Sequence, residues 1–351
     1  MKDFIYNQSR IRVVFGVGTV ARLREELERL NVSRPLFIAT PGRRADAEKA
    51  IGTLSGMNAA IRAEAVMHVP IETIGATASC ARVHNADSIV AFGGGSALDT
   101  SKAVGLELSL PVLAVATTYG GAEVTPSYGY TEGGIKKGKR DREMLPKTVI
   151  YDPALTVSLP PRVSGPSGIN AVAHCVEGLY ARDANPVMSL LAVEGIRTIA
   201  RSLPIVVKEP ADMNARTDAL YGAWLAGMVL GSVGMAVHHN ISHVLGGTFG
   251  LIHADAHTVI LPHSVAFNRD AAPEAMRAIA DALGATDPVR GIHDLAVKIG
   301  APTSLKEIGM PPDQLDRTAR IVVDHPYYNP RPVDFEGIRQ LLENAYEGKF
   351  D

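Results

Sequence analysis

The first part of the chain alternates short apolar runs with longer segments of helical periodicity. Gly, Pro, Asn or Asp bounds most of the apolar runs, as is typical of buried strands. We expect strands at residues 11–15, 36–40, 64–69, 88–92, 112–116 and 148–151. Helical stretches such as 20–30 and 45–54 lie between them. Strands that alternate with helices favour a doubly wound, mostly parallel sheet with helices on both faces.

The pattern changes after Pro153. Long apolar segments then recur with helical spacing, at residues 169–180, 188–202, 214–230 and 239–246. We therefore predict an α/β dinucleotide-binding domain at residues 1–155 and an all-α catalytic domain at 156–351, with the active site in the cleft between them. The polar stretch at 131–140 indicates a solvated hairpin loop or mobile segment.

Charge and cysteine content exclude several classes of protein. The 35 basic and 37 acidic residues give a net charge of -2, without the basic excess of a nucleic-acid-binding protein. Cys80 and Cys175 lie far apart and form no disulfide framework. The chain carries no apolar run typical of a signal peptide or a membrane span. We expect a cytoplasmic protein with no nucleic-acid or membrane partner.

A glycine-rich turn connects the strand ending at Phe92 to a helical segment beginning near Ala97. Glycines let the backbone approach a ligand closely, and a helix N-terminus offers free N–H groups to a phosphate. A second turn, TTYGG, follows the strand at 112–116. Because the carboxyl ends of parallel strands share one edge, the two turns predict a nucleotide site. The predicted cofactor contacts are Gly93, Gly94, Gly95, Ser96, Asp99, Thr117, Thr118 and Tyr119.

The sequence leaves the choice of nicotinamide cofactor open, with NADH as the first expectation and NADPH as the second. The glycine-rich turn is not the GxGxxG fingerprint, so the rules of that fingerprint do not apply. No acidic residue closes the second strand to reject a 2′-phosphate, and Arg43 or Arg44 in the next loop could hold one.

Histidines are concentrated in the second half, where six of the 11 lie between His238 and His263. His239 and His243 are four residues apart on a helical segment and therefore share one face. Asn170 and His174 have the same spacing on an earlier segment. Two helices that each offer a polar pair from apolar surroundings predict an interior site.

Four motifs together resemble the iron-containing alcohol dehydrogenases, which share the dehydroquinate synthase-like fold. They are GGGSALDTSK at 93–102, TTYGGAE at 117–123, GINAVAH at 168–174 and HNISHVLGGTFGLIH at 239–253. In metal-dependent members, an Asp and three His hold a divalent ion. The resemblance places those four ligand positions at Asn170, His174, His239 and His253. It also makes His243 a proton-relay group and Lys147 a contact of the nicotinamide-side ribose.

Asn170 departs from the metal-dependent pattern, because an amide replaces the only anionic ligand. A neutral set holds Fe²⁺ or Zn²⁺ less well than one with a carboxylate. Asn at this position, with the TTY turn and the HVLGGTF run, resembles the maleylacetate reductases, the metal-independent branch of the family. From this resemblance we expect that no metal is required.

The resemblance implies NAD(P)H-dependent reduction of the 2-ene of maleylacetate to 3-oxoadipate, in the breakdown of aromatic compounds. Hydride would add to the carbon β to the ketone, and the α carbon would then take a proton from His243. His239, His253, His174 and Asn170 would polarise and position the substrate. Tyr328 and Arg331 are candidate contacts for its two carboxylates. A homodimer is also implied.

Three alternatives remain. A metal-dependent alcohol or lactaldehyde-type dehydrogenase would oxidise simple alcohols and hold a metal despite Asn170. A cyclising lyase of the dehydroquinate synthase type would need zinc ligands, which Asn170 opposes. A non-catalytic nucleotide-binding protein would have no use for an interior cluster of polar groups, whose burial costs stability.

Overall fold

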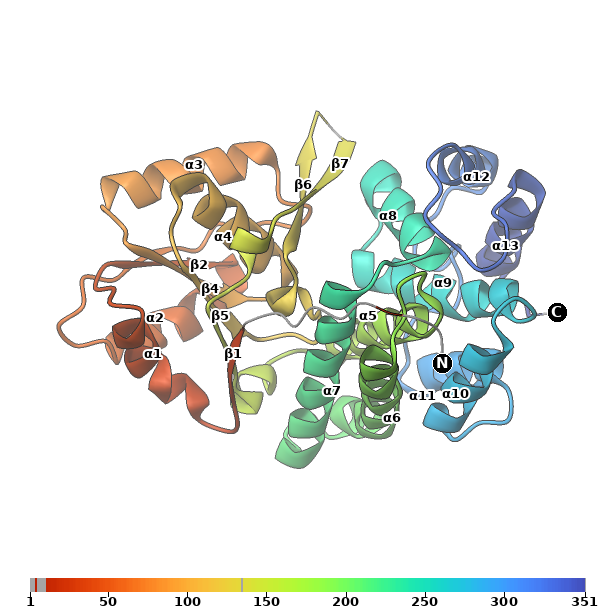
Figure 1. The fold of residues 1–351 in the computed structure, drawn as a ribbon, viewed down its shortest axis with the longest axis horizontal. Coiled ribbons are helices and arrows are strands. Elements are labelled where there is room, and N and C mark those ends of the chain that lie inside the picture. The colour runs from red at the N-terminus through yellow and green to blue at the C-terminus, as the bar shows by residue number, and fades with distance from the viewer. Residues whose placement is uncertain (1–3, 5–10, 134, 351) are drawn as a thin grey trace. The chain divides into compact units, whose positions relative to one another are not determined.

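The computed structural model describes residues 4, 11–133 and 135–350 (Figure 1). By their internal contacts, the residues divide into an α/β unit at Ser9–Leu159 and a helical unit at Pro160–Asp351. Each unit has its own hydrophobic core.

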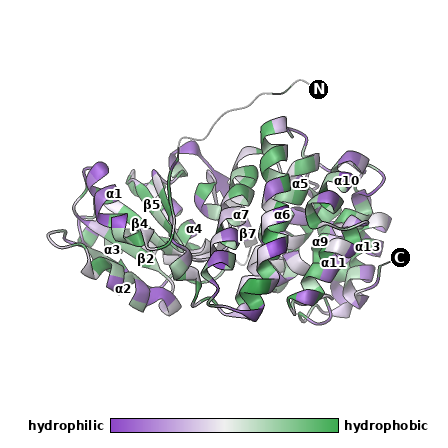
Figure 2. Cartoon of the chain, turned by 90° about the horizontal axis from the view of Figure 1, so that it is seen from below, coloured by the Kyte–Doolittle hydropathy of each residue, from purple (hydrophilic) through white to green (hydrophobic). Residues whose placement is uncertain are grey.

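The α/β unit is built on a six-stranded sheet in the order β1-β8-β5-β4-β2-β3, and every neighbouring pair is parallel. Its strands are β1 (Arg12–Phe15), β2 (Pro35–Ala39), β3 (Ala60–Arg62), β4 (Ser88–Gly93), β5 (Val112–Ala116) and β8 (Thr148–Tyr151). The central strands are buried along their whole length. Figure 2 shows β4 and β5 as hydrophobic, whereas α2 on the outside carries hydrophilic residues.

Helices cover both faces of this sheet, which confirms the predicted doubly wound architecture. The helices are α1 (Leu23–Arg29), α2 (Arg44–Gly52), α3 (Ile71–Val83) and α4 (Gly95–Leu108). Leu27 of α1 and Ala47 of α2 belong to one core cluster with Phe37, Val90 and Val115 of the strands. In Figure 1, α3 and α4 lie on the other face.

The prediction of a strand at residues 64–69 is wrong. The structure places β3 earlier, at Ala60–Arg62, where Ile61 lies opposite Phe37 of β2. Further along, His68 and Val69 adopt positive φ values of 64° and 46°, which a strand does not allow. An apolar run satisfied the sequence pattern here, but the backbone turns instead of extending.

The polar segment forms a hairpin of β6 (Ser127–Glu132) and β7 (Ile135–Arg140), in line with the predicted hairpin loop. Gly134 at its turn lies outside the described residues. The hairpin is attached to the rest of the unit, since Thr131 N donates to Val69 O at 3.0 Å. Gly129 N also donates to Asp99 Oδ2 at 3.2 Å.

The second unit is helical throughout its described residues, which confirms the predicted all-α domain. Its helices are α5 (Pro161–Tyr180), α6 (Pro186–Lys208), α7 (Met213–Ser232), α8 (Val237–Phe249), α9 (His253–Asn268), α10 (Pro273–Leu283), α11 (Pro288–Lys298), α12 (Leu315–Asp324) and α13 (Phe335–Glu347). Side-chain caps fix several starts: Asn185 Oδ1 accepts from Met188 N at 3.1 Å, and Asp212 Oδ1 from Ala215 N at 2.9 Å.

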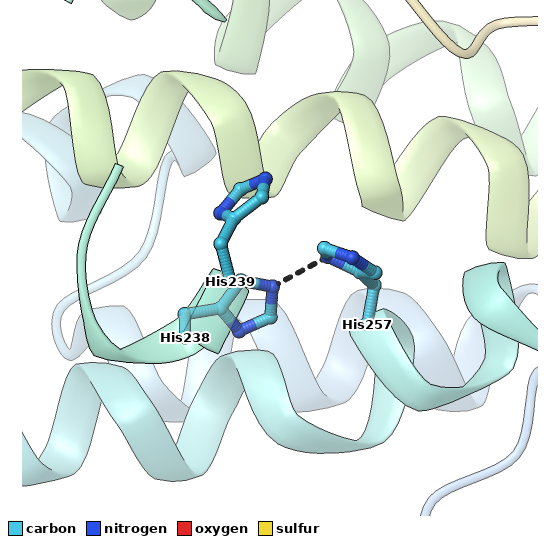
Figure 3. A group of neighbouring side chains, drawn as sticks. All are labelled: His238, His239 and His257. Atoms are coloured by element: carbon cyan, nitrogen blue, oxygen red, sulfur yellow. Dashed lines mark hydrogen bonds between the residues drawn. The ribbon is translucent and has the colours of Figure 1, made fainter. Parts of the chain in front are cut away.

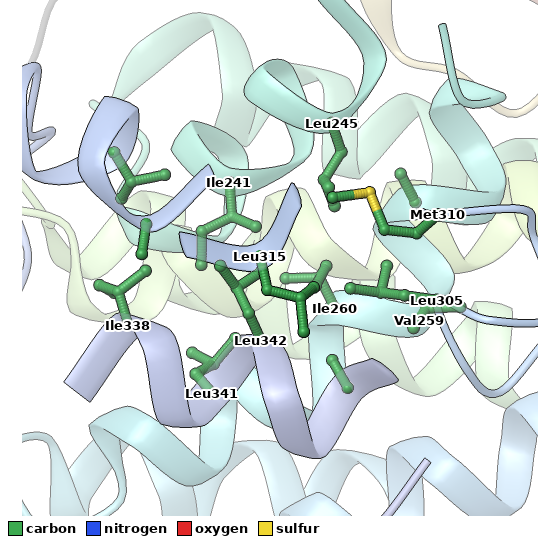
Figure 4. Close-up of a cluster of buried hydrophobic side chains, with 14 of the residues drawn as sticks. Ile241, Leu245, Val259, Ile260, Leu305, Met310, Leu315, Ile338, Leu341 and Leu342 are labelled. Carbon is green, nitrogen blue, oxygen red and sulfur yellow. The ribbon is translucent and has the colours of Figure 1, made fainter. Parts of the chain in front are cut away.

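A hydrophobic core joins α8 and α9 to α12 and α13 (Figure 4). Ile241 and Leu245 of α8 belong to it with Ile260 of α9, while Ile338 and Leu342 come from α13. This packing fixes α8 and α9, the two helices that carry most of the histidines. Among the described residues no single helix is long and apolar enough to cross a membrane. Only α7 and α8 taken together reach that length and apolar composition, and the two helices are bent by 98° relative to each other.

Candidate active site

Two turns meet at the carboxyl edge of the sheet, where the nucleotide site was predicted. Gly93 has a φ of 155°, and Gly94 is the N-cap of α4. Thr117 N donates to Gly93 O at 3.1 Å and so joins the turn after β4 to the turn after β5. A Cβ added at Gly94 would lie 2.7 Å from the Thr118 side chain. The close approach of these turns therefore depends on glycine at position 94.

The edge presents donors that suit a pyrophosphate. Gly95 is exposed at the start of α4, where N–H groups lack intrahelical partners. Thr117 Oγ1 is buried and has no hydrogen-bond partner among the described residues. The Asp99 carboxylate, by contrast, accepts from Gly129 N and ties α4 to the hairpin. Lys147 precedes β8 and thus lies at the amino ends of the strands, away from the two turns.

Lys102, which was not singled out from the sequence, stabilises the segment after the second turn. Its side chain is fully buried, and Nζ donates to Thr125 Oγ1 at 2.9 Å and to Ser127 O at 2.8 Å. Burial lowers the pKa of Lys102 to about 8. The lysine of the GGGSALDTSK motif therefore holds the neighbouring loop to α4.

Five histidines from α5, α8 and α9 form a continuous group in the helical unit, here called the histidine group. Their ring centroids lie 5.1 Å apart for His174 and His239, 4.8 Å for His239 and His257, 4.3 Å for His257 and His253, and 5.9 Å for His253 and His243. His174, His239 and His257 are buried, whereas His243 and His253 are half-buried. The structure thus brings together the four predicted histidines and adds His257.

Asn170 lies one helical turn before His174 on α5 and is also buried. Its Oδ1 has no hydrogen-bond partner among the described residues, and neither has His174 Nδ1. Burial lowers the pKa of His174 and His257 well below the ordinary value and that of His239 to about 3. These rings are therefore neutral at physiological pH, the form in which imidazole binds metals.

Glu177, which the sequence did not indicate as a site residue, orients His239. Its fully buried carboxylate accepts from Ala236 N and His238 N, each at 2.7 Å, and lies 2.6 Å from His239 Nδ1. The two backbone N–H donors favour the ionised form of the carboxylate, and in that form it accepts from His239 Nδ1. The lone pair of His239 is thereby left on Nε2, which is buried without a hydrogen-bond partner in the described structure. Burial has the largest effect and raises the pKa of Glu177 to about 8, although the N–H donors act to lower it.

The half-buried end of the histidine group adjoins Tyr327, next in sequence to the predicted substrate contact Tyr328. His243 Nδ1 is 3.1 Å from the hydroxyl of Tyr327, a residue that the sequence analysis passed over in favour of its neighbour. The ring of Tyr328 lies 4.9 Å from the Arg182 guanidinium. Arg331 stacks on Phe267, 4.1 Å from the ring centroid, and Nη1 donates to Phe267 O at 3.2 Å. Arg331, one of the two predicted substrate contacts, therefore has its guanidinium bound to Phe267 of α9.

His263 provides a pH-dependent contribution to stability outside the histidine group. It is buried against Phe350, with ring centroids 4.5 Å apart, and burial and nearby His293 lower its pKa to about 3. An unfolded chain protonates histidine near pH 6.5, so the unfolded state binds more protons as the pH falls below that value. We expect His263 alone to lower the unfolding free energy by about 2 kcal/mol between pH 7 and pH 5.

Urea unfolding at both pH values checks this expectation. His263→Gln, which cannot be protonated, should show a smaller loss of stability on acidification than the unaltered protein. The same pH dependence in both proteins would contradict it.

Both halves of the chain match models of one enzyme family. Residues 11–153 match the model described as iron-containing alcohol dehydrogenase, and residues 165–346 match the model described as Fe-containing alcohol dehydrogenase family, C-terminal. The chain belongs to the iron-containing alcohol dehydrogenase family.

The similar proteins carry a more specific name. The maleylacetate reductase of Sphingobium indicum is 50% identical over 99% of this chain and 98% of its own length. That of Burkholderia cepacia is 48% identical over 99% of both chains. The crystal structure of the maleylacetate reductase from Agrobacterium tumefaciens matches with a TM-score of 0.95 at 43% identity, over 99% of both chains.

The prediction that no metal is required is wrong, because the family whose models match both halves of the chain is iron-containing. The structure places donor atoms of a suitable kind in and beside the histidine group. Asn170 Oδ1, His174 Nδ1 and His239 Nε2 are buried without a hydrogen-bond partner among the described residues. Amide oxygen and neutral imidazole are ligands that Fe²⁺ accepts. None of these donors is a carboxylate, so the residues at this site would hold the ion by neutral groups.

Proposed function

We propose that this protein is a maleylacetate reductase, an oxidoreductase that converts maleylacetate to 3-oxoadipate with NADH or NADPH. The observation that carries the proposal is the identity of 50% with a maleylacetate reductase over nearly the full length of both chains. The buried group of neutral histidines in the helical unit supports it. Maleylacetate, NADH and one proton give 3-oxoadipate and NAD⁺, so the reaction needs a hydride donor and a proton donor.

The proton donor is His243. Its ring is half-buried, so it can contact both a bound substrate and solvent. Imidazole exchanges protons near neutral pH, which suits a group that must protonate the α carbon in every turnover. Tyr327, 3.1 Å away, holds the ring in place and links it to the surface, since 40% of the tyrosine is exposed.

The buried end of the histidine group, together with Asn170 and the half-buried His253, binds and polarises the ketone. Asn170, His174, His239 and His253 would hold the iron, which supplies a Lewis acid for the ketone oxygen when it is bound. Glu177 keeps His239 in the tautomer that presents Nε2, and the surrounding burial excludes water from this end.

The nicotinamide cofactor binds at the carboxyl edge of the α/β unit, with its pyrophosphate at the start of α4 and the turn 117–119 beside it. NADH remains our first choice. Arg43, the candidate for a 2′-phosphate, instead donates to Ser158 Oγ at 2.7 Å and pairs with Asp46. Arg44 pairs with Glu48 at 3.2 Å. We also propose a cytoplasmic homodimer.

The decisive experiment follows NADH oxidation with freshly generated maleylacetate. We expect turnover by the protein as purified, loss of rate after treatment with a chelator, and recovery when Fe²⁺ is added back. The alternative is a dehydrogenase of simple alcohols in the same family. Oxidation of such alcohols with NAD⁺, without reduction of maleylacetate, would contradict the proposal.

A further inference from the structure

A chain of hydrogen bonds beneath the histidine group sets the proton positions on two further rings. Ser264 Oγ lies 2.9 Å from Leu261 O and 3.3 Å from His238 Nδ1, and the shorter contact favours donation of its single hydrogen to the carbonyl. His238 therefore donates from Nδ1, and its lone pair is on Nε2. That nitrogen lies 2.8 Å from His257 Nδ1, drawn as the dashed line in Figure 3. His257 must donate from Nδ1.

The consequence is a free lone pair on His257 Nε2. This atom is fully buried and has no hydrogen-bond partner among the described residues. Its ring adjoins both His239 and His253, with centroids 4.8 Å and 4.3 Å away. One ring nitrogen each of His238, His239 and His257 lies within 4.8 Å of the others. His238 cannot ligate in this arrangement, because its lone pair is occupied by His257.

We propose that His257 Nε2 is an additional ligand for a divalent transition metal at the histidine group. His238 and Ser264 are positioning residues that hold His257 in the required tautomer. The inference extends the proposed function, because the ion is the one that the family implies. Imidazole suits borderline ions such as Fe²⁺, Co²⁺ and Zn²⁺. A further imidazole adds a neutral donor to a set in which Asn170 provides an amide oxygen.

Two fixed lone pairs support this assignment. Glu177 orients His239 from one side, and the chain from Leu261 O through Ser264 and His238 orients His257 from the other. Supporting hydrogen bonds of this kind determine which ring nitrogen a metal meets. A buried imidazole nitrogen without a partner lowers stability unless a ligand uses it.

The test measures Co²⁺ affinity of metal-free protein by competition with a chromophoric chelator. His257→Gln is expected to bind Co²⁺ about 10- to 100-fold more weakly. Its visible Co²⁺ spectrum should also change as a nitrogen ligand is lost. The matched control is His263→Gln, since His263 lies on the same helix, is buried and also has an unpartnered Nε2 in the described structure. Its Co²⁺ affinity and spectrum should equal those of the unaltered protein.

A folded His257→Gln protein with unchanged Co²⁺ affinity and spectrum would overturn the inference. If that variant does not fold, Ser264→Ala serves instead, because it removes only a hydroxyl; a weaker Co²⁺ affinity is expected, and an unchanged one would overturn the inference. Maleylacetate reduction by the unaltered protein is assayed separately. Its absence would refute the proposed function without altering the comparison of Co²⁺ affinities.

Discussion

Replacement of His243 by asparagine is expected to lower kcat for maleylacetate reduction by about 10²- to 10⁴-fold, the usual contribution of a general acid. Asparagine keeps a polar group near Tyr327 but cannot deliver a proton to the α carbon. The dissociation constant for NADH should not change, because we place the cofactor on the α/β unit. Steady-state kinetics and a fluorescence titration with NADH measure the two quantities.

His293→Asn is the matched control for His243→Asn. His293 is a half-buried histidine on α11 whose ring contacts Phe350 and lies outside the histidine group. Its replacement should leave kcat unchanged. If His243→Asn retained the full kcat, His243 would not be the proton donor, and Tyr327 would become the next candidate.

Replacement of Glu177 by glutamine is expected to weaken metal binding by about 10- to 100-fold and to lower the unfolding free energy by about 1–3 kcal/mol. A glutamine side chain has one acceptor oxygen, whereas the carboxylate serves Ala236 N, His238 N and His239 Nδ1 with two. The amide nitrogen of glutamine has two possible orientations. In the first it faces the backbone N–H donors and repels them, and in the second it donates a hydrogen to His239 Nδ1. In the second case the lone pair of His239 would move away from Nε2.

Glu26→Gln separates the two effects. Glu26 is likewise fully buried, and it accepts from Arg12 at 2.8 Å in the α/β unit. Its replacement should lower stability and leave Co²⁺ affinity unchanged. If Glu177→Gln behaved in the same way, Glu177 would be a structural residue only, without influence on the metal.

The fold could be predicted where local sequence and tertiary structure agree. Residues 88–92 and 112–116 form strands as expected, because both runs are apolar and both lie in the centre of the sheet. Residues 64–69 also contain an apolar run, at 65–67, but the backbone turns at His68 and Val69. A strand needs a neighbour as well as an apolar run, and the pairing of β3 with β2 cannot be recognised from either segment alone.

The site was predictable where residues share a helix face and not where they meet through tertiary contacts. A spacing of four residues placed Asn170 on the same helix face as His174, and it placed His239 on the same helix face as His243. Glu177 was missed, although it follows His174 by three residues on the same helix, because a buried carboxylate is recognised only by the donors around it. Those donors come from α8. Tyr327 was missed for the same reason, since its partner His243 is 84 positions away.

The metal-free prediction relied too heavily on the charge of one ligand. It compared Asn170 with an aspartate and neglected the number of neutral donors nearby. Within the described part of the chain, Asn170, His174 and His239 carry buried atoms without a hydrogen-bond partner. Several neutral donors in one place can retain an ion that a single neutral donor would lose.

The strand order of the sheet has a consequence for synthesis of the protein. β1 stands at the edge of the sheet as described, where β8 is its only neighbour among the described strands, with Val13 opposite Val149. On the ribosome, the first strand to emerge therefore waits without a partner until the last strand of the sheet has been made. β4 and β5, which are close in sequence, can pair much earlier. Nascent chains shorter than about 150 residues should thus hold a partial sheet whose amino-terminal strand is still undocked.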